Sequence, residues 1–165
     1  MNGKSRTFIK ISEQDSLKGK LIEVDDFAFA INSNDNNQSK PTLKRIAGVD
    51  ISASKLDNNL AVVALVILDY EKLDILYEKY ELVYLKQPYI PGFLAFREVE
   101  PLMKMFNDLV NFDNKLLPDI ILVDGNGIFH SNHFGLACHL GVLINIPTIG
   151  CSKTIFSVDG LNKVD

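Results

Sequence analysis

The chain has few cysteines and no strong excess of charge, and both features limit the classes of protein to which it can belong. Its 165 residues include two cysteines, Cys138 and Cys151, whose spacing fits no metal-binding pair, so we assign both to packing. So few cysteines favour a reducing, intracellular setting. The formal net charge of −4 argues against a protein that coats nucleic acid. It does not argue against clustered acids that hold a cation.

Long hydrophobic runs are also missing. The longest, residues 60–68, is too short to cross a bilayer, and the first residues lack the regions of a secretory signal. We therefore expect no membrane-spanning segment. With 47% hydrophobic and 23% charged residues, the composition is that of a globular protein, and the length suits one domain.

The first 40 residues differ from the rest. Residues 12–24 predict a short helix, and the polar, turn-rich stretch 31–41 predicts a linker. We therefore expect an N-terminal segment, 1–40, followed by one domain over 41–165.

The domain is predicted to begin with three strands. Residues 46–51 and 60–68 are short, apolar and rich in β-branched side chains, as in buried strands. Residues 75–85 alternate between two faces, with Tyr77 and Lys79 on one of them. Short links between the three strands suggest an antiparallel meander.

After Tyr89 the apolar residues recur at helical spacing. It predicts a helix over 94–110, which either kinks at Pro101 or becomes regular only near Glu100. The remaining pattern predicts a strand, a helix and a strand over residues 119–124, 134–143 and 146–151. A β-meander followed by alternating helices and strands is an α/β architecture with a mixed sheet, in the order of the ribonuclease H-like fold.

Three acids fall where such a sheet would bring them together. Asp50 and Asp124 each follow an apolar strand, where α/β folds tend to place ligands, and Glu98 follows a Pro/Gly loop near a helix start. Converging carboxylates suit Mg²⁺-dependent phosphodiester chemistry, because hard cations prefer oxygen ligands. Each acid alone has a simpler explanation as a turn former or a helix-start residue. The prediction of a nuclease depends on all three together.

Glycines and an aromatic residue accompany these acids. Gly125 and Gly127 would let the backbone approach a phosphate or a base, although the same residues could form a tight turn. Tyr89 lies in a proline-containing loop turned by Gly92. There its ring could stack on bases or pack on the protein surface.

Three basic residues have different expected roles. His130, six residues beyond Asp124, could contact a phosphate or polarise a water. Lys153 could contact phosphate from the same edge as Asp124, or be a solvated surface lysine. His139, on an apolar helix, is expected to be a hydrogen-bonded core residue.

Several stretches closely resemble the endonuclease V family. They include Pro-Tyr-Ile-Pro-Gly-Phe-Leu-Ala-Phe-Arg-Glu at 88–98, and the other matching stretches are residues 46–50, 122–127, 134–142 and 146–150. The amino-acid sequences of residues 125–127 and 137–142 are more similar to those of the eukaryotic branch. The resemblance implies a ribonuclease H-like fold and hydrolysis of a phosphodiester on the 3′ side of inosine. Eukaryotic members favour single-stranded RNA, and bacterial members act on deoxyinosine in DNA.

The resemblance also implies roles by position. Asp50, Glu98 and Asp124 match acids that bind Mg²⁺, for which Mn²⁺ would substitute, and His130 and Lys153 match residues near the scissile phosphate. Tyr89 matches a wedge tyrosine, and the positions that line the base pocket match Gly92, Gly125, Gly127 and Gly150. The implied partner is inosine-containing single-stranded RNA or DNA. The protein would be a monomer of the cytoplasm or nucleus, the nucleolus included.

Departures from the family pattern leave an alternative open. Family members continue beyond the position of Asp165 with a portion that carries another active-site histidine. Ser131 and Asn132 stand where relatives often have a basic residue, and Thr154 stands where a second lysine is common. The alternative is a protein that binds inosine or single strands without cutting. A Rossmann-like nucleotide-binding domain is disfavoured, because no Gly-x-Gly-x-x-Gly follows the first strand.

Overall fold

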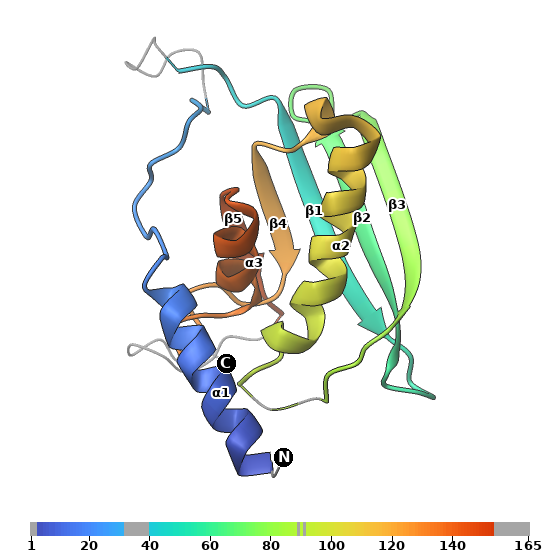
Figure 1. Cartoon of the computed structure of the whole chain (residues 1–165). Helices are drawn as coiled ribbons and strands as arrows, with labels where there is room; N and C mark the ends of the chain where they lie inside the picture. The colour runs from blue at the N-terminus through green and yellow to red at the C-terminus, as the bar shows by residue number, and fades with distance from the viewer. Residues whose placement is uncertain (1–2, 32–39, 89, 91, 154–165) are drawn as a thin grey trace, which may run out of the picture.

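The computed structural model describes residues 3–31, 40–88, 90 and 92–153, which form a mixed sheet with helices on one side (Figure 1). The strands are β1 (Arg45–Ala53), β2 (Leu60–Asp69), β3 (Ile75–Tyr84), β4 (Ile120–Asp124) and β5 (Thr148–Cys151). The helices are α1 (Gly3–Lys18), α2 (Ala95–Asp113) and α3 (Leu136–Ile144), with a short 3-10 turn at Asn114–Leu116.

The strand order in the sheet is β3-β2-β1-β4-β5. The first three strands form the expected antiparallel meander, and β4 and β5 then add in parallel on the other side of β1. This confirms the predicted α/β fold with a mixed sheet, in which a β-meander precedes alternating helices and strands. The division of the chain near residue 40 stays a prediction, and most of the expected linker, 32–39, lies outside the described residues.

The hydrophobic core lies between the sheet and the two helices α2 and α3, which cover the same face (Figure 1). Alternate residues of β2 point into it, and Val63, Leu65 and Ile67 are fully buried. These branched aliphatic side chains pack well on a pleated surface. The helices contribute their apolar stripes, with Leu102 and Leu109 of α2 also almost inaccessible. Burial of these residues fixes which side of every strand faces inward.

The opposite face of the sheet is apolar and exposed. Val62 and Leu82 face each other across β2 and β3 and are 42% and 66% exposed. Leu122 and Ile149 form the corresponding pair across β4 and β5 and are also exposed. The predicted alternation of β3 is confirmed in the structure, since Tyr77 lies on the inner side and its neighbours on the outer one.

One helix prediction differs from the structure and a second is confirmed. The amino-terminal helix covers Gly3–Lys18 rather than 12–24, and Gly19 follows its last residue, as is common where helices end. α2 (Ala95–Asp113) confirms the helix predicted over 94–110, and of the two alternatives it excludes a regular helix that begins only near Glu100, since it continues through Pro101. Pro101 is the seventh residue of α2, beyond the first four N–H groups that lack an intrahelical acceptor, so it removes one backbone hydrogen bond from the helix. None of the helices in the described residues is long and apolar enough to cross a membrane.

A matched pair of leucines tests the assignment of faces. Leu65→Ala should lower the free energy of unfolding by about 2–5 kcal/mol, because it leaves a cavity in the core. Leu82→Ala, on the exposed face, should change it by no more than about 0.5 kcal/mol. Urea denaturation followed by circular dichroism measures both. Equal losses in the two variants would mean that the open face is covered.

Candidate active site

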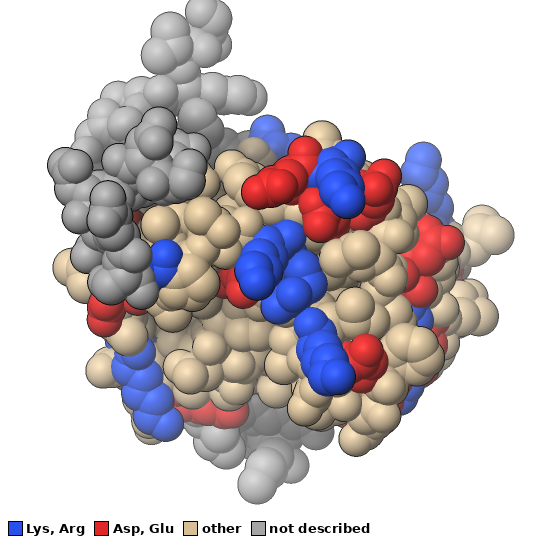
Figure 2. Space-filling model, turned by 90° about the horizontal axis from the view of Figure 1, so that it is seen from above, with Lys and Arg blue, Asp and Glu red and all other residues tan. Residues whose placement is uncertain are grey.

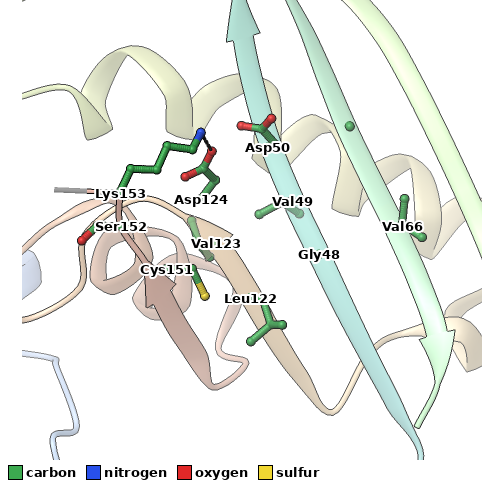
Figure 3. Close-up of a pocket in the computed structure, with 11 residues that line it drawn as sticks. Gly48, Val49, Asp50, Val66, Leu122, Val123, Asp124, Cys151, Ser152 and Lys153 are labelled. Atoms are coloured by element: carbon green, nitrogen blue, oxygen red, sulfur yellow. Dashed lines mark hydrogen bonds and ion pairs between the residues drawn. The ribbon is translucent and has the colours of Figure 1, made fainter. Parts of the chain in front are cut away.

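Asp50 and Asp124 lie side by side because their strands are paired in parallel. Val49 of β1 pairs with Val123 of β4, so the next residue on each strand is a carboxylate at the same edge of the sheet. The valines are buried on the helix side, which turns both aspartates to the open face. The structure thus brings together two of the three acids predicted from the sequence (Figure 3).

A cavity of about 590 Å³ adjoins these carboxylates on the open face. Its floor is apolar, formed by the outer side of β1, β2 and β4, with Gly48, Val66 and Leu122 among its residues. Cys151, Ser152 and Lys153 line it from the end of β5. Figure 3 shows Asp50 and Asp124 at one end of this hollow.

Glu98 approaches the two aspartates from the first turn of α2. Burial raises the pKa of its carboxyl to about 7, the nearby Arg97 opposes that rise, and the negative charges of Asp50 and Asp124 add to it. The third predicted acid therefore feels both of the others. At neutral pH it is poised between holding and releasing a proton.

Lys153 forms an ion pair with the site. Its Nζ donates to Oδ2 of Asp124 at 2.7 Å, and this hydrogen bond raises the pKa of the lysine (Figure 3). Among the residues that the structure describes, no three Asp, Glu, His or Cys side chains are grouped as a metal site. The donors nevertheless suit a hard cation, because Asp50 and Asp124 lie at one edge of the sheet and both of their charges act on the Glu98 carboxyl. The lysine side chain is 85% exposed, so it can leave Asp124 at little cost.

The loop after Asp124 is packed against β5 through glycines. The N–H of Gly125 donates to the carbonyl of Cys151 at 3.1 Å. A Cβ on Gly150 would lie 2.5 Å from the nitrogen of Gly127 and 2.7 Å from the carbonyl oxygen of Gly125. Since no side chain tolerates such contacts, only glycine fits at position 150 without a shift of backbone. Three of the four predicted pocket glycines therefore lie together.

Gly92, in the segment just before α2, borders the loop between β4 and α3. Its φ of +78° lies in the left-handed region, which favours glycine. A Cβ built on it would lie 4.0 Å from Nδ2 of Asn132, so the segment before α2 borders the loop that carries His130. Tyr89, the predicted wedge, lies outside the described residues, and its role stays a prediction.

His130 lies in the loop between β4 and α3 and is buried, with 9% of its surface exposed. Its Nδ1 accepts a hydrogen bond from the N–H of Asn132 at 3.2 Å. Burial lowers the pKa of the imidazole, and the charge of His133 lowers it further. The ring is therefore neutral at pH 7.

Arg97 is a residue that the sequence reasoning left without a role. Its guanidinium is buried, and it donates to the carbonyls of Gln87 and Asn58 and to Oδ1 of Asn59. It thereby ties the β1–β2 turn and the segment before Tyr89 to the helix that carries Glu98. The available signal was an arginine beside a predicted catalytic acid, within an otherwise apolar helix start.

One prediction about a side chain needs correction, and another is confirmed in part. Cys138 is buried as expected, but Cys151 is exposed on the open face, because its side chain points outward beside Asp124. His139 is buried, and burial lowers its pKa to about 4. The expected hydrogen bond is absent at Nδ1, which has no partner among the described residues. Phe96 contacts the ring edge-on instead.

The far end of the sheet has a different surface. Figure 2 views the molecule from above, away from the strand ends that carry Asp50 and Asp124. Lys and Arg side chains there are interspersed with Asp and Glu and form no broad basic patch on this face.

Comparisons with known proteins agree on one family. The family model described as Endonuclease V matches residues 25–164. Mouse endonuclease V is 42% identical over 92% of this chain and 43% of its own length, and the human protein is 40% identical over 92% and 52%. This chain spans about half the length of these curated relatives.

Solved structures agree with the sequence comparison. The catalytic domain of human endonuclease V superimposes with a TM-score of 0.85 at 36% identity, covering 99% of this chain and 64% of that one. Endonuclease V of Ciona intestinalis, in complex with DNA containing an inosine followed by a ribo-adenosine, gives 0.81 at 36% identity, covering 97% and 63%.

The raised pKa of Glu98 predicts a pH-dependent stability. A folded-state pKa of about 7, above the ordinary 4.5, means that the folded protein binds this proton more tightly than the unfolded chain does. Ionised Glu98 therefore destabilises the fold, fully above pH 7 and not at all below pH 4.5. In EDTA, Glu98→Gln should gain stability relative to the wild type as the pH rises through this window.

The matched control is Glu100→Gln, which removes an exposed carboxylate of the same helix. Its stability relative to the wild type should change little over the same pH range. Urea denaturation at pH 5 and pH 8 measures both variants. A constant difference between Glu98→Gln and the wild type would mean that Glu98 titrates normally.

Proposed function

Because the chain belongs to the endonuclease V family, we propose that it is a metal-dependent endonuclease acting on the 3′ side of inosine. The observation that carries this proposal is the electrostatic coupling of Glu98 to Asp50 and Asp124 at one edge of the sheet. Single-stranded RNA is the proposed substrate, with inosine-containing DNA as the other form. The inosine and ribo-adenosine in the DNA bound by the Ciona intestinalis protein support this choice.

The proposed cation ligands are Asp50 and Asp124, with Glu98 bound directly or through water. A bound Mg²⁺ or Mn²⁺ would polarise the phosphate and lower the pKa of an attacking water. The chain's part is to hold the carboxylates on adjacent strands, where the sheet restricts their movement. Lys153 would release Asp124 as the cation arrives and turn its ammonium toward a phosphate oxygen.

Glu98 and His130 have complementary proton chemistry. A carboxyl with a pKa of about 7 can accept a proton from a water and release it again near neutral pH. A neutral His130 can donate a hydrogen bond to a phosphate oxygen from the ring nitrogen that does not accept from Asn132.

The glycine-lined loop is the proposed base site. Gly125, Gly127 and Gly150 present backbone rather than side chains beside Asp124, and Gly92 borders the same loop. Backbone N–H and C=O groups can read the edge of a base that has left the stack. A side chain on Gly150 would displace this backbone, so the pocket and the packing depend on the same residue.

One observation favours the alternative of binding without cleavage. Lys153 already neutralises Asp124 in the structure, and a lysine that stayed there would compete with a cation for the carboxylate. In that case the glycine loop would still bind inosine. Cleavage and binding must therefore be measured separately.

The direct test is cleavage of a labelled single-stranded RNA with one inosine, beside the same RNA with adenosine. Cleavage should require inosine and Mg²⁺ or Mn²⁺ and stop in EDTA. Asp124→Asn should lower the rate roughly 10²–10³-fold with RNA binding largely kept, because one ligand charge is lost. Asp25→Asn, at an exposed acid between α1 and β1, is the matched control and should cut normally.

The results separate the two candidates. Inosine-selective binding by the wild type with no cleavage in either metal would favour the binding protein. Cleavage that survives in Asp124→Asn would remove this residue from the site. Equal binding of inosine and adenosine RNA, without cleavage, would leave only single-strand binding without selectivity for inosine. Neither binding nor cleavage of either RNA would exclude both candidates.

A further inference from the structure

The amino-terminal helix α1 contacts the loop that carries His130, and the roles proposed above do not use it. α1 packs against α3 beside this loop (Figure 1). Its Gln14 is buried, with 4% of its surface exposed. Nε2 of Gln14 donates to the carbonyl of Phe134 at 3.2 Å, and Oε1 accepts from Nδ2 of Asn132 at 3.0 Å. Both ends of the amide thus bind the loop, which satisfies a side chain that would otherwise be costly to bury.

Lys18 adds a second contact from the same helix. Its Nζ donates to the carbonyl of Asn132 at 3.2 Å. The side chain and the carbonyl of Asn132 are therefore both held by α1. The remaining polar group of Asn132, its N–H, donates to Nδ1 of His130. A continuous set of hydrogen bonds runs from α1 through Asn132 to the imidazole.

This arrangement selects one form of the imidazole. A ring nitrogen that accepts a hydrogen bond carries no proton, and a neutral imidazole has one proton to place. With Nδ1 accepting, the proton lies on Nε2. The N–H donor of the ring is then at Nε2, and a contact with a phosphate oxygen under the proposed function would use this atom. The other tautomer would present a lone pair to the phosphate and repel it.

We propose that Gln14 and Lys18 are positioning residues, which hold Asn132 so that its N–H keeps the His130 proton on Nε2, the ring nitrogen that would contact a substrate phosphate. The phosphate part rests on the proposed function, whereas the choice of tautomer does not. A helix near the amino terminus thereby determines the chemistry of a histidine more than a hundred residues away in the sequence.

The experiment reads the tautomer directly in the full 165-residue chain. Gln14→Leu removes both hydrogen bonds at similar side-chain volume, and Glu13→Gln, at an exposed neighbour on α1, is the matched control. ¹⁵N NMR of the imidazole, assigned with His130→Ala, distinguishes a proton on Nε2 from one on Nδ1. We expect the Nε2–H form in the wild type and in Glu13→Gln, and a mixture of both forms in Gln14→Leu.

Kinetics on inosine RNA supply the second readout. Gln14→Leu should lower kcat roughly tenfold with little change in KM, the size seen when a partner that orients a catalytic histidine is lost. Lys18→Met, which leaves the core untouched, should shift the tautomer and kcat in the same direction by a smaller amount. It carries the test if Gln14→Leu does not fold.

The outcomes keep the two proposals apart. An Nδ1–H form in the wild type, or an unchanged tautomer in a folded Gln14→Leu or Lys18→Met, would overturn the positioning role whatever the activity. A tautomer that shifts as expected in a protein that never cleaves RNA would support the positioning role and contradict the nuclease. A shift accompanied by the loss of kcat would support both.

Discussion

The parallel pairing of β1 with β4 is the constraint on which the site depends. Val49 and Val123 are opposite each other and buried beneath α2 and α3, so burial of two apolar side chains sets the register. Asp50 and Asp124 follow them directly and have no freedom to point elsewhere. A slip of one residue would turn a carboxylate into the core, where its charge would be unpaired. The energy of the hydrophobic core thus fixes the position of the acids.

The same arrangement holds like charges near one another. Glu98 responds with a raised pKa, and Asp124 responds by pairing with Lys153. Both responses lower the net negative charge at the edge of the sheet. They act on different groups and at different cost, since the Lys153 side chain is exposed while Glu98 is half-buried. Stability and chemistry therefore compete at this edge, as expected where acids are gathered for function.

Local patterns in the sequence predicted most of the fold and the place of the acids. Strands β1 to β3 were visible because short apolar or alternating runs have a two-residue period, and Asp50 and Asp124 were visible because each follows such a run. The contacts of Arg97 and Gln14 were not, since they join segments that are distant in sequence and follow no period. Cys151 was assigned to packing because its residue type favours burial, but β5 turns it outward.

The site combines a rigid part with a movable one, and the division follows residue type. The loop around Gly125 and Gly127 is backbone packed on backbone, closed by Gly150 at distances that admit no side chain. Such a surface has no rotamers to rearrange, so it suits the reading of a fixed shape such as a base edge. Lys153 is the opposite case, a long exposed chain with a single ion pair to Asp124. In the proposed function, selective recognition would thus rest on backbone, and the charge that moves when a cation or phosphate arrives would rest on a long exposed side chain.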